Sequence, residues 1–128
     1  MYSLKKNYQF SIVYKNGKSI ANKSLVMYLL PNSRNHINYG ISISKKLGKS
    51  VTRNRIRRLI KESLRLRSNN IKQGFDMVII ARSNAKELSF NEINKSIENL
   101  IKRHGIHIPT QILITINFIL FTCVSINS

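Results

Sequence analysis

A run of positive charge between Ser44 and Arg67 limits what this chain can fold into more than any other feature. The segment reads SKKLGKSVTRNRIRRLIKESLRLR and holds ten basic residues against one acid, Glu62. Its apolar members Ile56, Leu59, Ile60 and Leu64 fall within an arc of about 140° on a helical wheel. We therefore predict a helix, capped by Ser50, that buries one side and presents cations on the other.

Nine of the ten cations of this segment are candidate binding residues. Together with the asparagine between two arginines, they are Lys45, Lys46, Lys49, Arg53, Asn54, Arg55, Arg57, Arg58, Lys61 and Arg65. Arginine predominates, and its planar guanidinium can donate two hydrogen bonds to one phosphate. The lysines lie in a loop around Gly48, where backbone N–H groups and the positive end of the helix add to the attraction for anions.

The alternative interpretation is an ordinary solvated helix face. Such a face usually mixes both signs of charge, and like charges at this density destabilise a helix unless a partner neutralises them. Anionic lipid could also bind the cations, but the apolar side of the helix is needed for the core. Nucleic acid is therefore the favoured partner, and membrane contact is unlikely.

The charge of the whole chain agrees with this interpretation. Twenty-two Lys and Arg against five acids give a net charge of +17 over 128 residues, a length typical of one domain. Residues 1–75 hold 17 of the basic residues and one acid. Cys123 is the only cysteine, and the start of the chain lacks the apolar region of a signal peptide. We expect a protein of the reducing cytoplasm.

Local patterns predict an α+β fold. A first helix, capped by Asn7, is expected over 8–16 before Gly17, and a third from a capping box at Ser89 and Glu92 to about His104 and Gly105. Strands are expected over 25–30, 37–43 and 76–81. The predicted order is α, two or three strands, α, β, α, with the helices covering one face of a small sheet.

Three segments in this order resemble the bacterial ribonuclease P protein family. SISKKLGKSVTRNRIRRLIKESLR resembles its signature, with Arg53, Asn54 and Arg55 as the RNR motif. LKKNYQFSIVYKNGKSIANKSLVMYLL resembles its first helix and strands, and FDMVIIARSNAKELSFNEINKSIENLIKR its last strand and helix. The resemblance implies a domain with a left-handed βαβ crossover, like one found in a ribosomal protein. The usual rule for such crossovers predicts the opposite hand.

The resemblance also implies a function and a second site. Family members join a catalytic RNA that removes the 5′ leader of precursor tRNA. The RNA cuts with bound Mg²⁺, while the protein binds the RNA through the RNR face and holds the leader between its first helix and its sheet. Phe10, Tyr14 and Tyr28 match the leader positions. Helical spacing alone favours a core role for Phe10 and Tyr14, so packing and base stacking are both open for these residues.

The sequence offers no catalytic or metal-binding group for a protein that cleaves RNA itself. The five acids are spread singly over different predicted elements, and the three histidines belong to unrelated surfaces. We expect no cofactor bound by the protein and no catalytic residue. The alternatives to a ribonuclease P subunit are a structural protein that binds ribosomal RNA and, less favoured, a DNA-binding module.

We divide the chain into an RNA-binding domain over 1–105 and an atypical tail over 106–128. The tail carries an apolar-rich stretch from Ile112 to Val124 that the family pattern lacks. Thirteen residues are short of the ~20 needed to span a membrane. An extra strand or packed extension, a disordered or sticky appendage, and membrane contact remain open.

Overall fold

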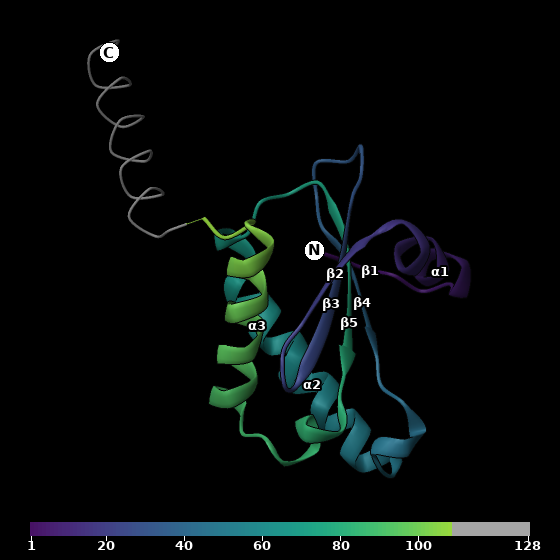
Figure 1. Ribbon diagram of the computed structural model, residues 1–128, viewed down its shortest axis with the longest axis vertical. Coiled ribbons are helices and arrows are strands. Elements are labelled where there is room, and N and C mark those ends of the chain that lie inside the picture. The colour runs from purple at the N-terminus through teal and green to yellow at the C-terminus, as the bar shows by residue number, and fades with distance from the viewer. Residues whose placement is uncertain (109–128) are drawn as a thin grey trace, which may run out of the picture.

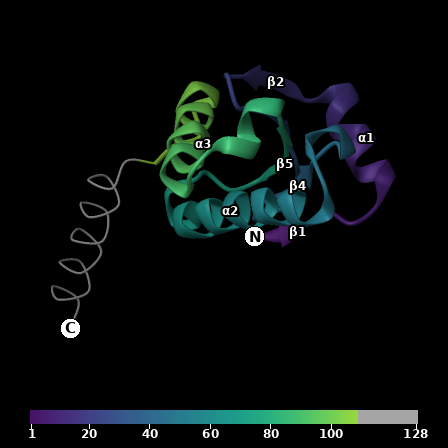
Figure 2. The ribbon, with the colours of Figure 1, turned by 90° about the horizontal axis from the view of Figure 1, so that it is seen from below.

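A five-stranded sheet separates helix α1 on one face from helices α2 and α3 on the other (Figures 1 and 2). This arrangement comes from a computed structural model, which describes residues 1–108. The helices are α1 (Asn7–Asn16), α2 (Ser50–Arg67) and α3 (Phe90–His104). The α+β class is confirmed, but the helices cover both faces of the sheet and not one.

The strands are β1 (Tyr2–Ser3), β2 (Lys18–Ala21), β3 (Leu25–Pro31), β4 (Asn38–Ser42) and β5 (Phe75–Ala81). Their order across the sheet is β1-β4-β5-β3-β2. β1, β4 and β5 run parallel, whereas β3 runs antiparallel to both β5 and β2. The predicted strands β3, β4 and β5 are confirmed. β1 and β2 were not predicted. α2 connects β4 to its parallel neighbour β5, so these three elements form the βαβ crossover.

Both faces of the central strands are apolar, which explains the three layers. On one face, Met27 and Ile79 are fully buried with the apolar stripes of α2 and α3. On the other face, Val78 is buried with Leu4 and with Val13 of α1. The alternation of side chains along a strand therefore supplies two cores from one sheet.

Two predicted helix caps are wrong. α1 begins at Asn7, and Lys6 is its cap residue; the Gln9 side chain reaches back to accept hydrogen bonds at 3.0 Å from the N–H groups of Lys5 and Lys6. α2 likewise begins at Ser50, after Lys49. The Ser and Asn pattern therefore predicts the start of each helix one residue too late.

The predicted ends of α3 are confirmed. The Ser89 hydroxyl accepts from the N–H of Glu92 at 3.4 Å, and the Glu92 carboxylate accepts from the N–H of Ser89 at 3.4 Å. Gly105 ends the helix in the left-handed region, with φ of 75°. Glycine adopts this conformation at little cost.

The chain continues to pack on the domain just after α3. Ile106, which the sequence analysis placed in the tail, is buried, and its carbonyl accepts from the N–H of Lys72 at 2.8 Å. The N–H of Ile108 donates to Asn70 at 2.7 Å. The expectations for the apolar stretch from Ile112 to Val124 lie outside the described residues. Within residues 1–108, no helix is both long and apolar enough to cross a membrane.

Candidate nucleic-acid interface

Helix α2 has the two sides that the wheel predicts. Ile56, Ile60 and Leu64 are buried and Leu59 is half-buried against the core. The exposed cations on the outer side are Arg55, Arg58, Lys61 and Arg65. We call the ten predicted nucleic-acid contacts, from Lys45 to Arg65, the basic face.

Several arginines of the basic face are held by the protein. Arg53 donates from Nε to the carbonyl of Gly48 at 3.2 Å and from Nη2 to the Ser50 hydroxyl at 3.3 Å. Arg55 donates from Nη2 to the carbonyl of Leu88 at 3.0 Å. These bonds use part of each guanidinium and orient the remainder, and such preorganisation reduces the entropy lost on binding.

Arg57 is half-buried and donates to the Asn54 side chain at 3.1 Å. Asn54 is therefore placed to orient Arg57. Among residues 1–108, Arg58 and Lys61 have no hydrogen-bonded or ion-paired partner of their own. Their charges are thus available to an external anion.

Arg65 forms an ion pair with Glu62 over one helical turn, with its Nη2 2.5 Å from Oε1. The hydrogen bond from Arg65 lowers the pKa of the Glu62 carboxyl. Both side chains are well exposed, so the pair contributes little to stability. A phosphate can replace this carboxylate as the partner of Arg65.

Three of the four lysines of the basic face surround a tight turn before α2. Lys45, Lys46 and Lys49 are all exposed. The turn begins with a 3₁₀ helix (Lys45–Leu47) in which the Ser44 hydroxyl accepts from the N–H of Lys46 at 3.2 Å. Gly48 follows with φ of 141°, a conformation that L side chains rarely adopt. The lysines therefore lie just beyond the carboxyl end of β4, beside the first turn of α2.

The structure brings the three predicted leader residues together on the opposite face of the sheet. The ring centres of Tyr14 and Tyr28 are 5.1 Å apart in an edge-on arrangement, and those of Phe10 and Tyr14 are 6.4 Å apart. Tyr14 is 37% exposed, while Phe10 and Tyr28 are half-buried. We call these three residues the aromatic cluster. It packs against the sheet and also leaves ring surface open to a ligand.

Residues beside the aromatic cluster were not predicted. Strand register places Val26 of β3, Ile80 of β5 and Ser42 of β4 in one row, next to the row that holds Tyr28. All three are half-buried. The signal that could have found them is this cross-strand register, which local patterns do not contain.

A hollow of about 840 Å³ lies along the outer side of α2 and was also not predicted. Its apolar lining comes from α2, from β4 and from the start of the chain. The lining residues are Met1, Tyr39, Arg55, Arg58, Leu59, Lys61, Glu62, Leu64, Arg65 and Ser68. The basic face therefore includes apolar surface between its cations.

Groups for acid-base or metal chemistry do not gather in the described part of the chain. No cluster of three or more His, Cys, Asp and Glu side chains occurs within residues 1–108. His104 is half-buried, with Nε2 3.0 Å from the carbonyl oxygen of Met27. Burial lowers the pKa of this imidazole, and the nearby charges of Lys18 and Arg103 act in the same direction.

Comparisons with known proteins agree on one family. The family model described as Ribonuclease P matches residues 1–105. A ribonuclease P protein component of Clostridioides difficile is 55% identical over 106 residues, covering 82% of this chain and 93% of the relative. One from Clostridium kluyveri is 51% identical over 109 residues, covering 84% and 97%.

Solved structures share the fold as well. The RNase P protein of Staphylococcus aureus matches with a TM-score of 0.78 and 38% identity, over 84% of this chain and 98% of that one. The protein from Thermotoga maritima matches with a TM-score of 0.75 and 29% identity, over 80% and 97%.

Proposed function

The chain belongs to the ribonuclease P protein family, and from this premise we propose how its two surfaces serve the maturation of tRNA. A ribonuclease P protein component is a subunit of an endoribonuclease that processes the 5′ end of precursor tRNA. In our proposal the basic face binds the RNA subunit, and the aromatic cluster holds the unpaired 5′ leader.

The observation that carries the proposal is the placement of two unlike surfaces on opposite faces of one sheet. The basic face offers Arg58 and Lys61 as cations that no acid within residues 1–108 neutralises. Phosphates of a folded RNA suit such a row, since each contact releases condensed counterions. The aromatic cluster offers ring surface at Tyr14, on which an unpaired base can stack. One small domain can therefore hold catalytic RNA and substrate at once.

The chemistry in this proposal belongs to the RNA. In this proposal Mg²⁺ would be held by RNA phosphates, where it would activate water and stabilise the leaving oxygen. The protein's residues would act by binding and orientation. We propose that the assembly works in the cytoplasm, on RNA rather than on DNA.

Reconstitution tests the proposal. Adding the full-length protein to a ribonuclease P RNA at low Mg²⁺ should restore cleavage of a precursor tRNA at its mature 5′ end. The Arg58→Ala, Lys61→Ala double variant is the matched control, because both residues are exposed and its fold should be unchanged. Absence of stimulation by the wild-type protein would contradict the proposal.

A structural protein that binds ribosomal RNA is the competing function. Such a protein would bind ribosomal RNA with its basic face but would leave the cleavage reaction unchanged. A competition assay distinguishes these classes of partner. In it, ribosomal RNA fragments or duplex DNA compete with the ribonuclease P RNA for binding to the protein.

A further inference from the structure

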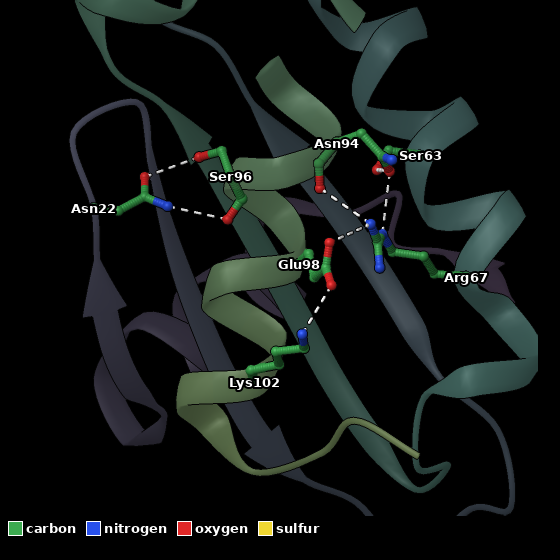
Figure 3. A network of polar contacts seen from close by, with 7 residues as sticks. All are labelled: Asn22, Ser63, Arg67, Asn94, Ser96, Glu98 and Lys102. Carbon is green, nitrogen blue, oxygen red and sulfur yellow. Dashed lines mark hydrogen bonds and ion pairs between the residues drawn. The ribbon is translucent and has the colours of Figure 1, made fainter. Parts of the chain in front are cut away.

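A polar network on the flank of α2 that faces α3 takes no part in either proposed RNA surface (Figure 3). Arg67 donates from Nε to Oδ1 of Asn94 at 3.1 Å and from Nη2 to Oε2 of Glu98 at 3.2 Å. Ser63, one turn earlier, donates its hydroxyl to the same Asn94 oxygen at 2.7 Å. We call Ser63, Arg67, Asn94 and Glu98 the α2–α3 clamp.

Arg67 differs from the other cations of its segment in how much of it is exposed. Its side chain is 15% exposed, whereas that of Arg65, two residues earlier, is 67% exposed. Glu98 also pairs with Lys102, with Nζ 2.9 Å from Oε1, so the clamp extends along α3. A guanidinium with fixed partners and little exposure has few donors left for a phosphate.

Within residues 1–108, the clamp is one of two polar attachments between side chains of α2 and the α3 region. The other is the bond from Arg55 to the carbonyl of Leu88, which directly precedes the cap residue of α3. The two attachments are 12 residues apart on α2, or about 18 Å along its axis. Two separated, directional contacts fix the rotation of a helix as well as its position.

Rotation matters because the cations lie on the side of α2 opposite its core stripe. Contacts of Ile56, Ile60 and Leu64 with the sheet are apolar and impose no direction, whereas hydrogen bonds do. Turning the helix by about 20° moves a side-chain end, about 5–6 Å from the axis, by about 2 Å. A displacement of this size is enough to break a contact between the side chain and a phosphate.

We propose that Arg67 is a positioning residue for RNA binding. Together with Asn94 and Glu98 it fixes the rotation of α2, so that Arg58, Lys61 and Arg65 meet the phosphates, and it does not contact RNA itself. This inference rests on the proposed function, because it requires α2 to face the RNA subunit.

The test compares Arg67 with the neighbouring Arg65 in the full-length protein. Binding of ribonuclease P RNA is measured over a series of salt concentrations for Arg67→Met, Arg67→Lys, Arg65→Met and Arg65→Lys. A stoichiometric titration gives the active fraction of each variant separately from its Kd. We expect both Arg67 variants to raise Kd by about three- to tenfold at every salt concentration. The slope of log Kd against the logarithm of the salt concentration should stay as in the wild type. Arg65→Met should instead reduce the slope by about one unit, and Arg65→Lys should keep it.

Three outcomes would overturn the inference. Recovery of the wild-type Kd by Arg67→Lys, or a reduced slope in Arg67→Met, would identify Arg67 as a phosphate contact. An unchanged Kd with a smaller active fraction would show that the clamp only stabilises the fold. If Arg67→Met does not fold, Glu98→Gln takes its place and must raise Kd at an unchanged slope. Failure of the wild-type protein to bind this RNA would contradict the proposed function instead.

Discussion

The ring of Tyr14 stands edge-on to the ring of Tyr28 at an interplanar angle of 72°, and this contact joins α1 to the sheet. Such an arrangement contributes about 0.5–1.5 kcal/mol beyond simple burial. The same ring of Tyr14 is the more open of the two. One pair of side chains thus supports the packing of α1 and offers a surface to a base.

Replacing Tyr14 with Ala should weaken binding of precursor tRNA to the reconstituted complex and leave mature tRNA almost unaffected. Loss of stacking on one base is worth about 1–3 kcal/mol, or roughly five- to a hundredfold in affinity. Tyr28→Ala should act in the same direction but also lower the melting temperature, because Tyr28 packs against a buried core cluster. Equal losses for the two tRNAs would show that these rings only pack.

Three arginine variants should test whether the basic face contacts the RNA subunit. Arg53→Ala, Arg55→Ala and Arg58→Ala should each weaken binding of the RNA subunit and reduce the salt slope by about one unit. Circular dichroism should be unchanged in all three. Arg58→Ala should leave the free energy of unfolding unaltered, whereas Arg55→Ala should lower it slightly, since the bond to Leu88 is lost. A wild-type slope in all three would exclude this face from RNA binding.

Gly40→Ala tests the space between β4 and α1. A Cβ atom at this position would lie 2.5 Å from Cε1 of Phe10, so the ring or the helix must move. We expect a loss of about 1–3 kcal/mol in the free energy of unfolding, measured with urea, and weaker binding of the leader. Adding Phe10→Leu should recover stability but not leader binding. An unchanged stability of Gly40→Ala would show that the ring moves freely.

The free energy of unfolding should fall as the pH drops below about 6.5, the ordinary pKa of a histidine. Burial lowers the pKa of His104, so at mildly acidic pH the unfolded chain binds a proton that the folded protein does not. Stability from this group is therefore present above its unfolded pKa and declines below it. His104→Gln should flatten the dependence in urea titrations between pH 7.5 and 5.5. The same slope in wild type and variant would assign the effect to other groups.

Helix α3 could be predicted in detail because its determinants are local. The Ser89 and Glu92 box and the glycine at position 105 lie within a few residues of the ends that they define. The amphipathic pattern of α2 is local in the same way. β2 contains only Ile20 as a sizeable apolar residue, and β1 has two residues, so both strands depend on partners distant in sequence.

In the candidate site, too, local patterns predict some features, whereas others depend on residues distant in sequence. Spacing on a helical wheel identified the exposed cations of α2 and left Arg67 out of them, but it could not show which residues hold Arg67. The partners of Arg67 belong to α3 and are 27 and 31 residues away. The contact between Tyr14 and Tyr28 needs the sheet as a scaffold. The family resemblance, and not the periodicity, predicted that Tyr14 and Tyr28 belong to one site.

β5 lies at the centre of the sheet although it is the last strand in the sequence. During synthesis on the ribosome, the hairpin of β2 with β3 and the edge formed by β1 and β4 are complete first, yet neither can join the other without β5. The cationic helix α2 also leaves the ribosome before the strand that anchors it. Until β5 (Phe75–Ala81) has also emerged, the nascent chain therefore displays the positive charge of α2 without the framework that selects an RNA. Ala81 must leave the ribosome before the protein can discriminate among the RNAs around it.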